Sequence, residues 1–375
     1  MRKVHAQKTV EQLTKEFNQA YTQETGRKLL FAYAKDNYYN SKNGQGHYYM
    51  AWSFEGLLQA WQATGDPEFF DDLQQIINSL RSSAKNLKGI SKDFRGWPAG
   101  DQYYKENGAT LFDSYLWRFV FTFYRIIEQS PNLKKENLNW YEDNLNWAIK
   151  NIWDRYENQG IQYYIYRENP YMTSHWGRIA MELYLITSEP KYLITFENIS
   201  YKGISGKAQN GQHILNRFKP NVGKKGALDF SPNWSLEATG TTDGGHFSDV
   251  VSFITNAIEN KMYWHTQKEW LLPGIISTYR DIVWDDKKNM MGTGYLNGTS
   301  DPSGYAQYGR TPISQGAQLN LGRFDENFQK LLEEHYTPNA NTFNKVLLAG
   351  ILLNNRVILE NGKPFYPEVY IYSEN

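Results

Sequence analysis

The sequence contains no cysteine among its 375 residues. This absence excludes disulfide bonds, thiol catalysis and cysteine-ligated metal, and it leaves the redox compartment open. No apolar run approaches the roughly 20 residues of a membrane span, so we expect no transmembrane segment. The start, Met1–Thr9, lacks the apolar core of a signal peptide. A secreted or periplasmic protein whose leader had been removed would begin in the same way.

Net charge is also absent, because 40 Lys and Arg residues balance 40 Asp and Glu residues. Without a long basic run we expect no nucleic-acid partner, and a polyanionic ligand would need a local basic cleft. No phosphate-binding glycine motif precedes a helix in a βαβ context, which disfavours a nucleotide enzyme. No His-x-x-x-His pair occurs, which disfavours zinc. We therefore expect neither metal nor cofactor, although convergence of His47, His175 and His246 on a metal stays open.

Aromatic side chains, by contrast, are abundant: they make up 16% of the chain and include 12 Trp and 28 Tyr. Hydrophobic residues reach 40%, which is enough for a substantial core. Most of these rings are expected in that core. The excess also suits a sugar-binding cleft, where apolar sugar faces stack on exposed rings.

The stretch Asp243–Ile254 contains the most informative histidine of the sequence, His246. Its polar, glycine-rich start is followed by apolar residues at helical spacing, which predicts a helix with His246 in its first turn. Gly244 and Gly245 leave space for a ligand to approach the backbone, and the free N–H groups of a helix start attract anions.

Two other histidines have a similar setting. His47 follows Gly46 and opens a helical run that ends near Gly65, and His175 follows Thr173-Ser174 and opens another. A lone histidine at such a junction is more often a cap or a surface residue. Three of them, each followed by an aromatic residue, favour a shared rim.

The periodicity of the helices predicts the fold. Inner helices are expected to begin near residues 47, 110, 173, 246 and 313, at intervals of 63 to 73 residues. A period of this size with a helix pair in each unit is typical of repeat architectures. We predict an all-α fold, an (α/α) toroid or incomplete barrel of six or seven helical hairpins with long active-site loops, forming one domain over 1–375. The alternative is an open helical array with scattered histidines.

Other elements are predicted along the same lines. Helices are expected over 10–25, 66–87, 109–129, 137–156, 265–284, 312–334 and 342–354, with a partner helix from 189, a possible helix near 209–218, a strand pair over 160–171 and long loops over 201–242 and 290–311. Loops of that length suggest function rather than connection.

The second long loop carries tyrosines between glycines and close to an arginine. Tyr305, Tyr308 and Arg310 are its notable residues. A nearby guanidinium favours the phenolate and lowers a tyrosine pKa, which makes Tyr305 or Tyr308 a candidate proton-transfer group. Packing of the rings onto the barrel is an equally good explanation for either one.

Tyrosine, histidine and arginine together fit β-elimination on a uronic-acid polymer. Such an enzyme must neutralise the carboxylate, remove the C5 proton and protonate the leaving oxygen. Glu237 could supply a protonated carboxyl donor in an apolar pocket, although a solvated glutamate is the commoner case.

These features resemble the toroid-fold polysaccharide lyases, and most closely polysaccharide lyase family thirty-eight, whose members cleave alginate or glucuronan. The resemblance rests on His246 in its Gly-Gly-His setting, the loop 304–310 and the repeated helix pairs over about 40–355. It implies metal-independent elimination with Tyr305 as the catalytic tyrosine and Tyr308 as its rival. It also implies that His246 acts at the reacting sugar, with Glu237 and Arg310 as weaker matches. No asparagine clearly matches the neutraliser that many such lyases use.

The predicted partner is thus an acidic polysaccharide, and the sequence does not define the oligomeric state. The proposed substrate-binding residues are His47, Trp52, Trp97, Tyr103, His175, Trp176, Trp234 and Tyr308.

Two other functions compete with this hypothesis. A glycoside hydrolase on the same toroid needs two carboxylates, for which Asp113 with Asp101 or Asp243 could serve. Asp113 could equally cap its helix or bond a neighbouring one. A non-catalytic glycan-binding protein would use the aromatic residues alone.

Overall fold

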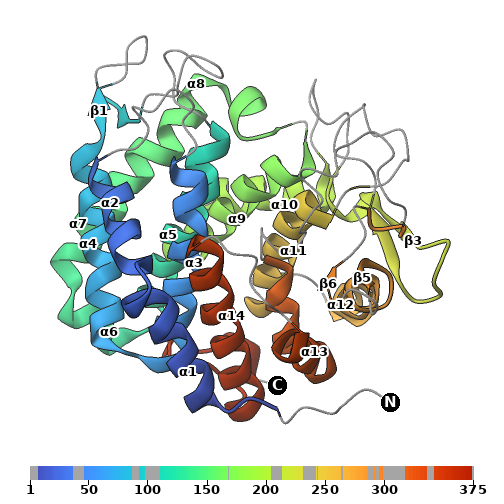
Figure 1. Ribbon diagram of the computed structural model, residues 1–375. Coiled ribbons are helices and arrows are strands. Elements are labelled where there is room, and N and C mark those ends of the chain that lie inside the picture. Colours follow the sequence, from blue (N-terminus) through green and yellow to red (C-terminus); the bar gives the residue numbers. More distant parts are fainter. Residues whose placement is uncertain are drawn as a thin grey trace.

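Helices account for almost all of the regular structure in the computed structural model (Figure 1). The all-α class predicted from the sequence is therefore confirmed. The structure describes residues 7–36, 46–86, 93–97, 110–167, 169–203, 213–230, 242, 244–262, 265–285, 290–291, 295–298, 317–335 and 342–373. Among the helices of these ranges, none is both long enough and apolar enough to cross a membrane.

Six segments contact one another in series through the middle of the molecule. They are α3 (Gly46–Thr64), α5 (Thr110–Glu128), α9 (Pro170–Thr187), α11 (Gly244–Glu259), the 3-10 segment η9 (Ala317–Phe324) and α14 (Thr342–Asn361). Each packs on the next, and α14 packs on α3, so the contacts return to the first helix. We call these six the inner segments.

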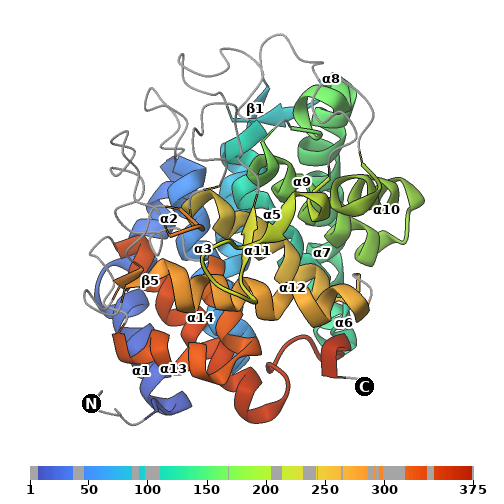
Figure 2. The same cartoon turned by 90° about the vertical axis from the view of Figure 1, so that its right-hand side faces the viewer.

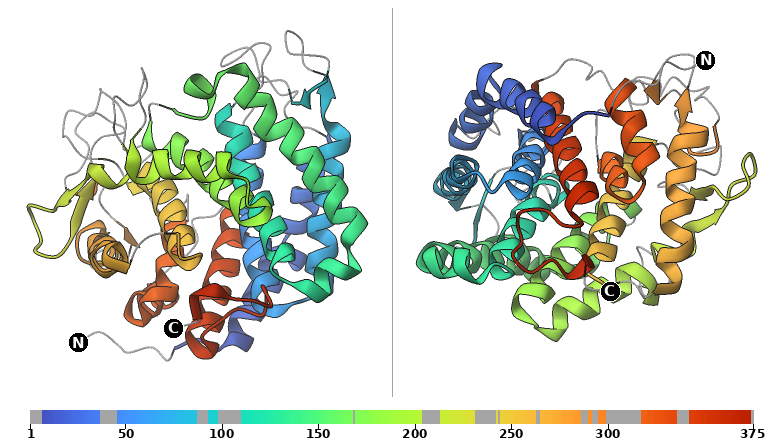
Figure 3. Two further views of the ribbon diagram at one scale, coloured as in Figure 1. Left: turned by 180° about the vertical axis from the view of Figure 1, so that it is seen from behind. Right: turned by 90° about the horizontal axis from the view of Figure 1, so that it is seen from below.

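Most other helices lie against the outside of the inner segments, as the view from below shows (Figure 3). For example, α4 packs on α3, α10 on α9, α13 on η9 and α1 on α14. The outer helices are α1 (Val10–Asn18), α2 (Gly26–Asp36), α4 (Pro67–Ser83), α6 (Pro131–Glu136), α7 (Leu138–Ala148), α8 (Arg155–Tyr164), α10 (Pro190–Glu197), α12 (His265–Ser277) and α13 (Glu326–His335).

Short irregular segments extend several of these helices. Four are π-helical: η1 (Gln19–Gln23), η3 (Ile149–Asp154), η4 (Asn198–Lys202) and η6 (Thr278–Val283). Two are single 3-10 turns: η5 (Leu215–Arg217) and η10 (Ile371–Ser373). The strands form antiparallel pairs: β1 (Lys85–Asn86) with β2 (Arg95–Gly96), β3 (Phe218–Pro220) with β4 (Leu228–Phe230), and β5 (Trp284–Asp285) with β6 (Met290–Met291). The β3–β4 hairpin extends away from the helices beside α12 (Figure 1), and it points toward the viewer in Figure 2.

Local chemistry explains the sharp turn between α3 and α4. Gly65 has φ +67°, a conformation that favours glycine, and its N–H donates to the carbonyl of Trp61 at 2.8 Å. Asp66 then caps α4, because its Oδ1 accepts from the N–H of Glu68 at 2.8 Å. Pro67 follows at the first helical position, where its missing N–H costs nothing. Both predicted boundaries at this turn are confirmed.

Other predicted elements were wrong or incomplete. The strand pair expected over 160–171 is wrong, because α8 continues to Tyr164 and α9 begins at Pro170. Gly160, with φ +127°, bends α8 instead of ending it, and Ile165 packs in the core beyond it. Gly26 opens a second helix, which the sequence interpretation had missed. The described part of 209–218 contains one 3-10 turn rather than the helix considered there.

Candidate active site

Contacts between residues near the starts of α3, α5, α9 and α11 place these starts at one end of the molecule. The contacting pairs are His47 Nδ1 with Asp113 Oδ1 (3.2 Å), Ser114 Oγ with His175 Nδ1 (3.5 Å) and the rings of Tyr171 and His246 (4.5 Å between centroids). Two of the three histidines singled out in the sequence are therefore close together, because Tyr171 also contacts the His175 ring at 6.2 Å.

His246 lies in the first turn of α11 and is half-buried. Its imidazole packs against the phenol ring of Tyr171, which comes from the first turn of α9. Gly244 and Gly245 precede it and are buried, and Gly244 accepts a hydrogen bond from the hydroxyl of Tyr279 at 3.1 Å. The helix start thus holds an imidazole and a phenol side by side at a partly accessible position.

His175 lies deeper than the sequence had suggested. The expected start of its helix at Thr173-Ser174 is wrong, since α9 begins at Pro170 and His175 falls in its second turn. Proline at the first helical position, after Asn169, explains the earlier start. His175 is consequently fully buried rather than at the junction.

The surroundings of His175 keep it neutral. Its Nε2 lies 3.4 Å from Oδ2 of Asp249, and Oδ1 of the same carboxylate accepts from Arg118 Nη2 at 2.8 Å. Burial, followed by the positive charge of Arg118, lowers the pKa of His175 to about 4, although Asp249 opposes the shift. A neutral imidazole at this position can exchange a proton only with an immediate neighbour.

Ser114, His175 and Asp249 do not form a nucleophilic triad. The Ser114 hydroxyl donates to the carbonyl of Leu111 at 3.1 Å and lies 3.5 Å from the His175 ring nitrogen. Ser114 is also fully buried, so a substrate carbonyl has no access to it. The geometry therefore does not support acyl transfer.

A second charged cluster surrounds Asp113 at the start of α5. One carboxylate oxygen contacts His47, and the other accepts from Tyr156 at 2.7 Å and from Arg155. Burial raises the pKa of Asp113, but Arg155 and His47 outweigh it and hold the value below its usual range. His47 is buried too, and burial lowers its pKa below the usual value. This carboxylate is thus ionised and tied to three neighbours.

Stacked aromatic rings lie beside His175. Tyr48 stacks on Tyr115 with ring centroids 4.2 Å apart, and the Tyr115 ring lies 5.0 Å from that of His175. The indole N–H of Trp52 donates to the Tyr115 hydroxyl at 2.9 Å. Burial, and then the charge of Asp249, keep the pKa of Tyr115 well above its usual value. The Tyr115 phenol is therefore a neutral hydrogen-bonding group.

The other described aromatic candidates for sugar binding lie in the core. Trp97 is 1% exposed and contacts the rings of His47 and Trp117, while Trp176 is fully buried against Trp153 and Tyr156. Trp52 is 6% exposed. All three rings therefore pack in the core.

Several predicted site residues fall outside the described ranges. They are Tyr103, Trp234, Glu237, Tyr305, Tyr308 and Arg310, together with the alternative carboxylates Asp101 and Asp243. Their roles stay predictions.

Below the histidines, polar side chains continue along the inner segments and bond between them. The bonded pairs are Arg118 with Asp249 (2.8 Å), Arg125 with Glu182 (2.5 Å), Arg178 with Ser252 (2.6 Å) and Asn320 with Glu55 (3.2 Å). All of these residues are at most 6% exposed. Isolated buried charges cost several kcal/mol, so this buried polar column depends on pairing.

Sequence reasoning missed Tyr171, Arg118 and Asp249. The sequence did hold a signal for Arg118 and Asp249, because polar residues recur every three or four positions on otherwise apolar helices. His175, Arg178 and Glu182 on α9 illustrate this spacing. That spacing places them on one helix face. Tyr171 had no such signal, since the wrong strand assignment covered it.

Within the described part of the chain, no group of three or more His, Asp or Glu residues is arranged to hold a metal ion. Comparison with known proteins gave no match, whether the chain was compared with family models, curated proteins or solved structures.

Proposed function

We propose that the protein is a polysaccharide lyase that cleaves a 4-linked polyuronate, alginate or glucuronan, by metal-independent β-elimination. The observation that best supports this proposal is the pairing of the Tyr171 phenol with the His246 imidazole at the start of α11. Phenol and imidazole are the two groups that proton transfer in such a reaction uses. The substrate would then be an extracellular polymer, and a secreted or periplasmic location belongs to the same proposal.

The reaction needs a base, an acid and a neutraliser. The base takes the C5 proton, the C4–O4 bond breaks as a C4–C5 double bond forms, and the leaving O4 receives a proton. Tyr305, or Tyr308 in its place, is the proposed base and acid, with Arg310 and Glu237 at the carboxylate. His246 is proposed to act at the reacting sugar, and Tyr171 is a further phenol within its reach.

The toroid of six or seven hairpins is part of the same proposal. It is supported by the series of contacts through the inner segments, which leads from α3 back to α3 through α14. It is also supported by the shared end at which α3, α5, α9 and α11 begin. In a toroid, the loops that precede inner helices gather at that end, which is where a long substrate would bind.

The hydrolase alternative gains no support from Asp113. A general acid must carry a proton at working pH, whereas Asp113 is ionised, 1% exposed and bonded through both oxygens. This carboxylate instead fixes the starts of α3 and α5. A glycan-binding protein without activity remains the second alternative, and it differs from a lyase by forming no new chain ends.

Incubation with alginate, glucuronan and pectate tests the proposal, because elimination creates an unsaturated sugar that absorbs in the near ultraviolet. We expect absorbance to rise on at least one polymer. Tyr305→Phe should abolish the rise, and His246→Ala should remove most of it while the melting temperature stays unchanged. Tyr308→Phe and Tyr171→Phe are the matched controls, and loss in one of them alone would reassign the base. No rise on any of the polymers contradicts the proposal.

A further inference from the structure

The chain after α14 covers the other end of the inner segments (Figure 3). The N–H groups of Phe365 and Tyr366 donate to the carbonyl of Gln62 at 2.8 and 3.0 Å, and that of Val369 donates to Gln129 at 3.1 Å. Tyr366 also stacks on Trp61 with centroids 4.9 Å apart. This tail, residues 362–373, therefore bridges the ends of α3 and α5.

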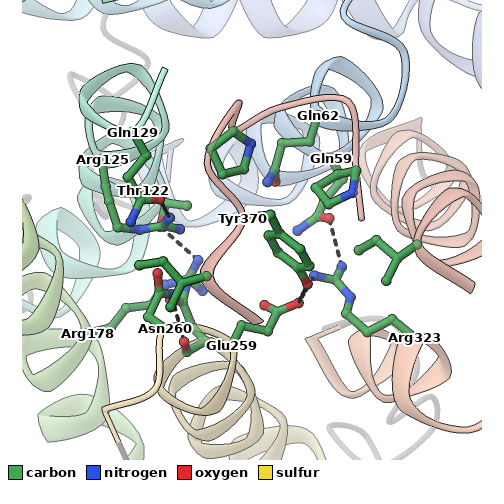
Figure 4. A pocket seen from close by; sticks show the side chains of 15 residues that line it. Gln59, Gln62, Thr122, Arg125, Gln129, Arg178, Glu259, Asn260, Arg323 and Tyr370 are labelled. Atoms are coloured by element: carbon green, nitrogen blue, oxygen red, sulfur yellow. Dashed lines mark hydrogen bonds and ion pairs between the residues drawn. The ribbon is translucent and has the colours of Figure 1, made fainter. Parts of the chain in front are cut away.

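A small polar cavity lies beneath the tail (Figure 4). Its volume is about 30 Å³, and roughly 10–15 Å³ is needed to hold one water-sized guest. The lining side chains are Gln59, Gln62, Thr122, Arg125, Gln129, Arg178, Asn256, Glu259, Asn260, Arg323, Ile358, Pro364, Pro367, Tyr370 and Ile371. The cavity is too small for a sugar ring and lies at the end opposite His246.

Three arginines line this space: Arg125, Arg178 and Arg323. Two of the three arginines have a carboxylate partner: Arg125 Nε lies 2.5 Å from Glu182, and Arg323 Nη1 lies 2.9 Å from Glu259. Tyr370 donates its hydroxyl to the same Glu259 oxygen at 3.2 Å. The third arginine, Arg178, shares the Glu182 carboxylate with Arg125.

Arg178 contacts mainly neutral acceptors. Its two terminal nitrogens donate to the hydroxyls of Ser252 and Thr122, at 2.6 and 2.8 Å. Its Nε lies 3.8 Å from Glu182, and it has no hydrogen-bond partner among the described residues. Arg178 is 4% exposed, so water does not compensate its charge. Burial lowers its pKa to about 10, which leaves it cationic at neutral pH.

One further carboxyl group, Glu55, lies within electrostatic reach of Arg178 and Arg323. It is 1% exposed, and its Oε1 accepts from Asn320 at 3.2 Å. Burial raises its pKa, so Glu55 is the carboxyl that most readily becomes neutral. The other nearby cation, Arg118, is already paired with Asp249. When Glu55 is neutral, the three arginines share only Glu182 and Glu259, which leaves room for one negative charge beside the unpartnered Nε of Arg178.

We infer that this cavity binds one small monovalent anion, a halide such as chloride, beside the guanidinium of Arg178 and beneath the C-terminal tail. The unpartnered Nε of Arg178 supplies one donor. The Gln62 amide, which donates one hydrogen to the carbonyl of Tyr366 at 3.4 Å, supplies a second through its other hydrogen, and the size admits a single ion. The bound anion would couple the tail to the inner segments, because both contribute to the cavity wall.

Thermal unfolding at constant ionic strength tests this inference, with sodium chloride replacing sodium gluconate stepwise. An anion that binds only the folded state raises the melting temperature in a saturable way. We expect a rise of about 2 °C in the wild-type protein. Arg178→Met should lose the rise, and Arg280→Gln, which alters a partly exposed arginine elsewhere, should keep it.

Gln62→Glu provides an independent variant that leaves Arg178 in place. It is nearly isosteric and adds a negative charge to the cavity wall, so it should also abolish the response to chloride. Glu55→Gln removes the competing carboxylate and should keep or strengthen the response. If the Arg178 variant does not fold, the Gln62 variant decides.

Three results would overturn the inference. They are equal melting temperatures of the wild-type protein in the two salts, an unchanged chloride response in Gln62→Glu, or no anomalous peak in the cavity of bromide-soaked crystals. Any of these would identify the space as filled by water alone.

Discussion

The neighbours and the burial of each histidine, rather than the residue type alone, decide whether it can exchange a proton with a ligand. His246 and His175 lie near the same phenol, yet only His246 is partly accessible. His175 is enclosed and has the pKa of a base that stays neutral. In the proposed reaction, proton transfer with a substrate would therefore fall to His246, whereas His175 contacts the buried Asp249.

The buried imidazole makes a prediction about acid stability. The pKa of His175 falls from 6.5 to about 4 on folding, so between these values the unfolded chain binds a proton that the folded chain does not. Stability contributed by this group is present above about pH 6.5 and is lost as the pH falls toward 4. In His175→Gln this loss is absent, and the unfolding free energy should change by about 3 kcal/mol less over that window.

Urea unfolding at several pH values measures this difference. Burial also lowers the pKa of His47, so His47 too makes the folded protein less stable as the pH falls. Because both proteins contain His47, its contribution cancels when their pH profiles are compared. Parallel pH profiles for the wild-type and variant proteins would show that His175 is not held neutral by the fold.

At the scale of single residues, the sequence located part of the site. His246 in a first helical turn was predicted because glycines and an apolar periodicity marked the helix start. The partners Tyr171, Arg118 and Asp249 were not predicted, since pairing across helices depends on which helix faces which. Periodicity within one helix identifies a face, and only the packing identifies its neighbour.

At the scale of elements, the backbones of α3 and α14 approach each other closely at two glycines, Gly56 and Gly350. A Cβ atom on Gly350 would lie 2.0 Å from the carbonyl oxygen of Gly56, and one on Gly56 would lie 2.3 Å from that of Val346. Neither backbone can move without shifting a whole helix. The two glycines therefore allow the first and last inner helices to meet.

Gly350→Ala should accordingly destabilise the protein. Alanine in a helix gains about 1 kcal/mol over glycine. Overpacking costs about 1–3 kcal/mol, and the upper end applies here because the new Cβ would meet backbone atoms that cannot turn aside, so a net loss is expected. Gly223→Ala is the control, because the nearest atom would lie at 3.4 Å and the residue is exposed. Denaturant midpoints measure both variants, and equal midpoints would refute the tight contact.

Most helices could be predicted from the sequence, and the errors share a cause. α3, α5 and α10 matched their predicted ranges or starts because a cap, proline or glycine marked their boundaries. The first helix does end before Gly26, as predicted, but a second helix that was not predicted begins at that glycine. At Gly160, where strands were expected, the chain continues as helix. Glycine permits several conformations, and tertiary packing selects among them.

At the scale of the whole molecule, the two ends of the inner segments have different chemistry. One end gathers helix starts, histidines and phenols, and the other is covered by the tail above a cavity rich in arginine. The all-α class followed from periodicity in the sequence, whereas the buried polar column between the ends did not. Its members come from α3, α5, α9, α11 and η9, which are far apart in the chain.

The central claim, elimination rather than hydrolysis, is tested most directly by degrading the polymer in oxygen-18 water and analysing the products by mass spectrometry. Elimination adds no water across the broken bond, so we predict unsaturated products without the heavy isotope. Saturated products that carry one oxygen-18 atom at each new reducing end would contradict the account and identify a hydrolase.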